Sequence, residues 1–283
     1  MLSIDYDSSK TALYTPALRQ TVFEAGKSYS KLQLGSECAR LAYLKAEAST
    51  HEKGILEEAL SRVGFADVRL FGDATTGTQG FGCLRQSDKQ AIIAFRGTQP
   101  DEVTDLATDL RADTVPWPEA GGRVHRGFAM SLRSVLPGVM AWLENECSAR
   151  ASLLICGHSL GAALATLTAS VLREFSLVTL GSPRVGDEEF ASTLRGADVT
   201  RVVDCCDIVT QLPPETPWYT HVGSKMYVDR NGAIAVGPLP QDVLEDQARA
   251  RSEYILEHAW KAGSVAVRDL ADHAPVNYIR AFF

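Results

Sequence analysis

The chain has 283 residues, of which 45% are hydrophobic, and its formal net charge is −7. This length and apolar content suffice for one large core. The acidic net charge and the absence of a basic cluster in the sequence argue against a nucleic-acid-binding protein. No stretch reaches the roughly 20 uninterrupted apolar residues of a membrane-spanning helix, so we expect at most a transient contact with a lipid interface.

The first hundred residues are expected to form a helical part followed by strands. Apolar positions recur near one face in the helical part, which we place over residues 13–63, and a compact apolar run is typical of a strand buried on both faces. The expected elements are helices over 13–48 and 52–63 and strands over 67–71, 79–84 and 91–95.

A lid-like segment is expected over residues 99–112. Pro100 followed by two acidic residues is a helix-start pattern, and Val103, Leu106 and Leu110 then fall on one face of a short amphipathic helix. A further helix is expected over 127–147, disturbed at Pro137 and Gly138.

Strands and helices alternate in the middle of the chain, which predicts a parallel sheet with right-handed crossovers. The expected strands are 152–156, 176–180 and 200–203, and the helices between them are 160–174 and 187–194. We therefore expect one α/β domain over residues 1–283, with a central, mostly parallel sheet flanked by helices.

After residue 218 the pattern changes to a hairpin and a helical cover segment over 224–272. Residues 225–228 and 233–236 flank an Asn-Gly turn, which favours a hairpin. A charged helix is expected over 240–262 and a final helix over 274–282.

The six cysteines show no framework spacing, and Cys205 and Cys206 are adjacent. We therefore expect reduced thiols. We expect no metal site, because neither Cys-x-x-Cys nor His-Glu-x-x-His occurs. We also expect no cofactor. Residues 1–10 have no apolar core, so they do not resemble a signal peptide. We expect a cytoplasmic protein, leaderless export, or a leader that has been removed.

The pentapeptide Gly157–Gly161 reads Gly-His-Ser-Leu-Gly and lies between an expected strand and an expected helix. A G-x-S-x-G sequence in this context is the nucleophile elbow of serine hydrolases. The serine occupies a sharp turn, and glycines two places away avoid a collision. Ser159 is therefore our candidate nucleophile.

A serine nucleophile needs a base, and that base needs an orienting acid, which follow in the order serine, acid, histidine in this fold class. His221, His258 and His273 follow Ser159. The residues alone favour His273 only modestly over His221, because a loop before the last helix can project it over the sheet.

Three aspartates compete for the acid. Asp204 and Asp207 follow an expected strand at the carboxyl edge of the sheet, where α/β sites gather, and Asp187 follows another strand after a longer loop. Each of them also suits a solvated loop or a helix cap.

Several motifs in one order resemble the class 3 lipase family, whose members have the α/β-hydrolase fold. The similarity extends over roughly residues 88–282 and is carried by Phe95–Thr98, Val124–Phe128, Gly157–Gly161, Gly181–Gly186, Arg201–Val203 and Leu212–Pro214.

The resemblance implies a catalytic triad of Ser159, Asp207 and His273. The family's acid lies shortly before Leu-Pro-Pro, which selects Asp207, and its base lies in an Asp-His pair before a terminal aromatic-rich helix. The resemblance also implies an oxyanion hole formed by the amide of Leu160 and by Thr98. It leaves structural roles for the other histidines near the site, which are His125, His158 and His221.

These features predict a carboxylic ester hydrolase that forms an acyl-enzyme on an acyl ester or lipid. The lid-like segment contains no aromatic residue, so we expect short-to-medium acyl esters or glycerides to be preferred over long-chain emulsions. The alternatives are a phospholipase A1, a feruloyl-type esterase, and, in a different class, a non-catalytic interaction module on a hydrolase fold.

Overall fold

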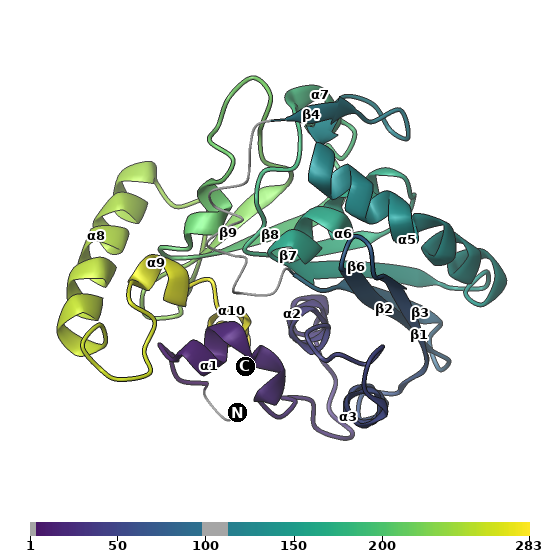
Figure 1. Ribbon diagram of the computed structural model, residues 1–283, viewed down its shortest axis with the longest axis horizontal. Coiled ribbons are helices and arrows are strands. Elements are labelled where there is room, and N and C mark those ends of the chain that lie inside the picture. Colours follow the sequence, from purple (N-terminus) through teal and green to yellow (C-terminus); the bar gives the residue numbers. More distant parts are fainter. Residues whose placement is uncertain (1–3, 98–112) are drawn as a thin grey trace.

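One mixed sheet of eight strands forms the centre of the molecule in the computed structural model, which describes residues 4–97 and 113–283 (Figure 1). The strand order is β1-β2-β3-β6-β7-β8-β9-β10. The strands are β1 (Phe65–Asp73), β2 (Thr78–Arg85), β3 (Gln90–Phe95), β6 (Ser152–His158), β7 (Ser176–Leu180), β8 (Asp198–Asp204), β9 (Ser224–Val228) and β10 (Ile234–Val236). The lid-like segment 99–112 lies outside the described residues.

The middle of the sheet is parallel, as the sequence predicts. Strands β3, β6, β7, β8 and β9 pair in parallel, whereas β1, β2 and β10 add antiparallel strands at the two edges. The expected hairpin is confirmed by the pairing of β9 with β10. Because parallel strands all point the same way, β6 and β8 end at the same edge of the sheet.

Helices cover both faces of the sheet (Figure 1). Helices α5 (Arg126–Asn145) and α6 (Leu160–Ser170) pack on one face, and α2 (Lys31–Leu41), α3 (Thr50–Ser61) and α10 (Pro275–Ile279) pack on the other. Each face has its own apolar core, which includes Trp142 on the α5 side and Phe81 on the α2 side. Among the described residues, no helix is long and apolar enough to cross a membrane.

The smaller elements lie in the connections. A two-stranded sheet pairs β4 (Thr114–Pro116) with β5 (Arg123–His125). Further helices are α7 (Glu188–Ser192), the 3₁₀ turn η3 (Ile208–Gln211), α8 (Pro240–Glu257) and α9 (Arg268–Ala271).

Several expected helix boundaries are wrong, most clearly over residues 13–48. The structure has α1 (Lys10–Tyr14), a 3₁₀ turn η1 (Pro16–Leu18), a non-helical stretch and then α2. Pro16 cannot continue the first helix, and α2 begins anew at Ser30, whose side chain accepts from the Gln33 amide in a capping box. Helix α5 continues through Pro137, whereas α6, α8 and α10 end earlier than expected.

The N-terminal segment lies against the C-terminal part of the chain. The Lys10 amide donates to the Gly263 carbonyl, and the Val265 amide donates to the Ser8 carbonyl. The side chain of Asn277 accepts from the Asp7 amide and donates to the Asp7 carbonyl. These bonds tie the beginning of the chain to the segment that carries His273.

Candidate active site

The turn between β6 and α6 holds Ser159 in a strained conformation, with φ 58° and ψ −128°. A Cβ atom on Gly157 would lie 2.2 Å from the carbonyl oxygen of Gly161, and one on Gly161 would lie 2.2 Å from the carbonyl oxygen of Phe95. Both contacts are far inside van der Waals range, so side chains are excluded two places on either side of the serine. The G-x-S-x-G pattern is therefore a steric requirement of this turn.

The structure brings Ser159, His273 and Asp207 together. His273 Nε2 lies 2.9 Å from Ser159 Oγ, and His273 Nδ1 lies 2.8 Å from Asp207 Oδ2. The three residues are at most 1% exposed. Because Asp207 is an acceptor, the Nδ1–H donates to it and leaves the Nε2 lone pair facing the serine hydroxyl. This is the arrangement of a nucleophile, a base and an orienting acid.

The carboxylate of Asp207 has two further donors. The Tyr278 hydroxyl donates to Oδ2 at 2.5 Å, and the Val209 amide donates to Oδ1 at 2.8 Å. Burial and the charge of Asp207 raise the pKa of Tyr278 well above its ordinary value, so the phenol stays a donor. Sequence analysis did not single out Tyr278, because a tyrosine in the final helix has no distinguishing local signal.

The rival acids lie elsewhere. Asp187 caps α7 by accepting from the Phe190 amide. Asp204 is fully buried and lies 3.6 Å from the Arg280 guanidinium, and its carboxyl oxygens accept no hydrogen bond from the described residues. Burial and the nearby charge of Asp272 raise the pKa of Asp204 well above its ordinary value.

The rival bases also lie outside the triad. His221 Nε2 donates to the Thr210 carbonyl at 2.8 Å, and burial together with Arg201 and Arg184 lowers the pKa of His221 to about 3. His258 contacts the Ser8 hydroxyl at 3.1 Å. Neither ring reaches Ser159, so both suit structural roles.

His158 packs beneath the elbow, where the sequence analysis expects it. Its Nε2–H donates to the carbonyl of His273 at 2.8 Å, so its Nδ1 accepts from the Tyr43 hydroxyl at 2.7 Å. Burial and the neighbouring His273 lower the pKa of His158 well below its ordinary value. A neutral histidine therefore supports the backbone of the candidate base.

The expected oxyanion hole is described only in part. Leu160 begins α6 directly after Ser159, at a helix N-terminus whose free amides favour an anion. Thr98 lies outside the described residues. Its neighbour Gly97 lies against Ser159, because a Cβ atom on Gly97 would be 3.0 Å from Ser159 Cβ.

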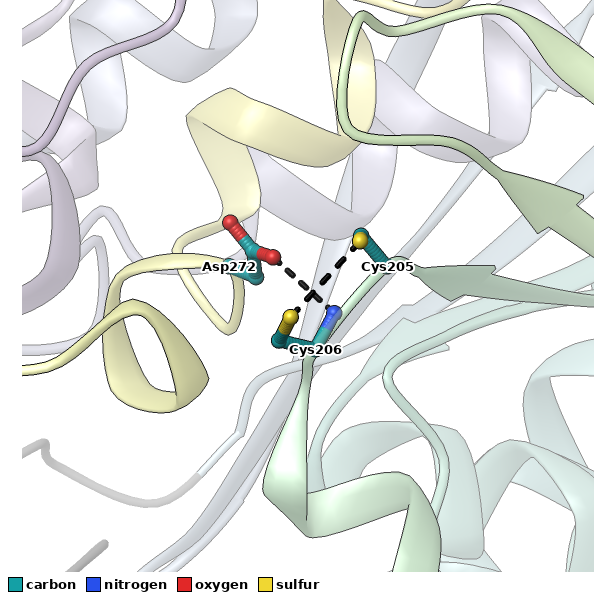
Figure 2. Close-up of side chains that lie close together, drawn as sticks. All are labelled: Cys205, Cys206 and Asp272. Atoms are coloured by element: carbon teal, nitrogen blue, oxygen red, sulfur yellow. Dashed lines mark hydrogen bonds between the residues drawn. The ribbon is translucent and has the colours of Figure 1, made fainter. Parts of the chain in front are cut away.

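Cys205, Cys206 and Asp272 are buried together beside the triad, and their potential ligand atoms lie within 4.8 Å of one another (Figure 2). The two thiols are hydrogen-bonded, with 3.6 Å between the sulfur atoms, and do not form a disulfide. The Asp272 carboxylate already accepts from the Cys206 amide, and a buried Arg268 guanidinium lies against it. A cation would be repelled by that guanidinium, so the donor set does not suit a metal.

A family model described as lipase (class 3) matches residues 92–216. This range contains Ser159 and Asp207 and ends before His273. A lipase from Rhizomucor miehei is 31% identical over 171 residues, which are 56% of this chain and 47% of the relative. A secreted mono- and diacylglycerol lipase from Fusarium solani is 36% identical over 181 residues, covering 59% of this chain and 50% of the relative. The chain spans about half the length of these curated relatives.

Two further similarities cover more of the chain. A chloroplastic phospholipase A1 from Arabidopsis thaliana is 24% identical over 96% of this chain and 62% of its own length. A triacylglycerol lipase structure, described as having a serine protease triad at its catalytic centre, covers 85% of this chain and 94% of its own, with a TM-score of 0.59 and 20% identity. At that identity the structural likeness concerns the fold alone.

Proposed function

We propose that this chain, which belongs to the class 3 lipase family and has the α/β-hydrolase fold, is a carboxylic ester hydrolase that uses Ser159, His273 and Asp207. The observation that carries the proposal is the His273 ring, which is hydrogen-bonded to the serine hydroxyl on one side and to the Asp207 carboxylate on the other. An unused site would not need a strained, buried serine in contact with an oriented imidazole.

The geometry supports a two-step reaction through an acyl-enzyme. His273 Nε2 takes the proton of Ser159 as Oγ attacks the ester carbon, and the tetrahedral intermediate collapses when His273 returns that proton to the leaving alcohol. Water then repeats the sequence and releases the acid. Asp207 holds the ring in the correct tautomer throughout, and Tyr278 and the Val209 amide hold Asp207.

The tetrahedral intermediate carries a negative oxygen that requires nearby donors. We assign this role to the amide of Leu160 and to Thr98. The N-terminal end of α6 supports the first assignment, and the contact of Gly97 with Ser159 supports the second.

We propose short-to-medium acyl esters or glycerides as substrates. The Fusarium relative is named a mono- and diacylglycerol lipase, and the net charge of −7 opposes binding to anionic lipid surfaces. Phospholipase A1 activity is the second candidate, because the plant relative of that name aligns with nearly the whole chain.

The six free cysteines favour a reducing compartment for this protein, although the Fusarium relative is named as secreted.

The first test compares wild type with Ser159→Ala on p-nitrophenyl esters from acetate to palmitate, together with labelling by a fluorophosphonate probe. We expect hydrolysis and labelling in wild type, and a loss of at least about 10³-fold in kcat in the variant. A wild-type protein that is folded but neither labelled nor active would instead support the non-catalytic interaction module. Activity that survives the substitution would place the nucleophile elsewhere.

A further inference from the structure

A buried carboxylate connects the two loops that hold the acid and the base. Asp272 directly precedes His273, and its Oδ2 accepts from the backbone amide of Cys206 at 2.9 Å (Figure 2). Cys206 in turn directly precedes Asp207. Asp272 and Cys206 are both fully buried, so water does not compete for this bond. One hydrogen bond therefore joins the residues immediately before both partners of the His–Asp pair.

The remaining hydrogen-bonding capacity of the Asp272 carboxylate is filled by Tyr6, which is distant in the chain, and by Arg268, one helical turn before it. The Tyr6 hydroxyl donates to Oδ1 at 2.8 Å, and Arg268 Nε lies 2.8 Å from Oδ1 and 3.0 Å from Oδ2. The Arg268 guanidinium also stacks on the Tyr6 ring, with 4.5 Å from Cζ to the ring centroid. Charge-assisted, fully satisfied bonds of this kind fix a side chain in one position.

From these contacts we propose that Asp272 is a positioning residue of the triad, an inference that rests on the proposed function. Its carboxylate sets the distance between the Cys206–Asp207 loop and the His273 loop, so that Asp207 Oδ2 meets the His273 Nδ1–H. Asp272 does not contact Ser159 or the reacting atoms. It acts by placing Asp207 and His273, the residues that follow Cys206 and Asp272 in the chain.

The placement matters because the base must present its Nε2 lone pair to Ser159 at hydrogen-bond distance. A displacement of about 1 Å in a reacting group can cost about 100-fold in rate. The Asp207–His273 hydrogen bond joins the two loops through side chains. The Cys206–Asp272 hydrogen bond joins the same two loops one residue earlier in each. Loss of its acceptor should therefore lower kcat while leaving substrate binding unchanged.

The test separates the acceptor from the charge. Removing Asp272 alone would leave Arg268 buried without an anion, which is strongly destabilising. Both variants therefore carry Arg268→Met. In one, Asp272→Asn keeps a carbonyl oxygen for the Cys206 amide, and its NH₂ group can donate to the Tyr6 hydroxyl. In the other, Asp272→Leu has similar size and no acceptor. Circular dichroism and thermal unfolding define a temperature at which both variants are folded.

We expect the Asn variant to keep kcat within about threefold of wild type, and the Leu variant to lose at least about tenfold in kcat with KM within about twofold. Equal kcat values in the two folded variants would overturn the proposal. Asp269→Asn is the matched control, because Asp269 lies in α9 beside Arg268 and pairs with Arg251, whereas the Cys206 amide donates to Asp272. That control should leave kcat within about twofold of wild type.

A second measurement does not depend on any substrate. The proton shared by His273 Nδ1 and Asp207 should give a far-downfield ¹H NMR resonance in wild type and in the Asn variant, and this signal should be lost or shifted in the Leu variant. A signal that is unchanged in the Leu variant would also overturn the proposal. If the signal follows the acceptor while wild type hydrolyses no ester, the positioning role stands and the proposed function fails.

Discussion

Three histidines, two of them fully buried and His221 partly buried, differ in their roles because their partners differ. His273 faces a serine and a carboxylate, His158 bonds to a tyrosine and a backbone carbonyl, and His221 bonds to the Thr210 carbonyl. Burial disfavours the charged form of His158 and of His221 and lowers the pKa of each. A neutral histidine can hold a backbone in place without bringing a charge to the triad.

Because the folded protein holds His221 neutral, we expect His221→Gln to reduce the pH dependence of stability. The pKa of His221 is about 3 in the folded protein and about 6.5 when unfolded. Between these values the unfolded chain binds the proton and the folded protein does not, so stability falls as pH falls from about 6.5 towards 3. Glutamine cannot titrate and can still donate to the Thr210 carbonyl.

Urea unfolding at several pH values from 7.5 to 4 would measure the effect. As pH falls, the free energy of unfolding of wild type should decrease by at most about 1.4 kcal/mol per pH unit more than that of the variant. His51→Gln at an exposed position serves as the control. Identical pH profiles for His221→Gln and wild type would contradict the assigned pKa.

At the scale of elements, α5 shows how a local sequence rule yields to packing. Pro137 and Gly138 oppose helix continuation, yet α5 runs unbroken from Arg126 to Asn145. Both residues are exposed, whereas the opposite face buries Trp142 against the sheet. Burial of that apolar face outweighs the local preference.

Exposed Gly138 of α5 and Gly82, which faces α5 from the sheet, should respond in opposite ways to alanine. A Cβ atom on Gly138 meets nothing within 4 Å, so Gly138→Ala should stabilise the protein by about 0.5–1 kcal/mol. A Cβ atom on Gly82 of β2 would lie 2.8 Å from the Trp142 ring, so Gly82→Ala should destabilise by about 1–3 kcal/mol. Denaturant unfolding of the pair tests the packing directly, and the same sign of change in both would refute it.

At the scale of the whole molecule, the N-terminal and C-terminal segments meet near His273, the proposed base. The N-terminal segment bonds to residues 263–277 through Ser8, Lys10 and Asp7, and Tyr6 adds its bond to Asp272. Figure 1 shows α1 beside α10. A segment far from Ser159 in sequence is thus part of the framework that holds His273.

Charge and surface composition predict the substrate preference of the whole molecule. The net charge is −7 and the segment 99–112 contains no aromatic residue, so adsorption to a fat droplet should be weak. We expect kcat/KM to peak at short-to-medium acyl p-nitrophenyl esters, with little gain when triolein is presented as an emulsion. Strong activation at the triolein interface, measured by titration of released acid, would contradict this prediction.

The elements that could be predicted from the sequence are those whose causes are local. The apolar runs predict the parallel strands, the Asn-Gly turn predicts the β9–β10 hairpin, and the glycines around Ser159 predict the elbow, because each depends on sterics or periodicity within a few residues. The prediction of one helix over residues 13–48 is wrong, because the apolar spacing continues past Pro16 although the first helix ends before it.

Which side chains meet at the site follows from the folded structure and could not be read from local sequence. His273 lies 114 residues from Ser159 and 66 from Asp207, and its rivals His221 and His258 carry the same chemistry in the sequence. Tyr278 and Asp272 acquire their proposed roles from hydrogen bonds that cross the fold. Local sequence sets backbone conformation over a few residues, whereas a site is built from contacts between distant segments, and those exist only once the core has packed.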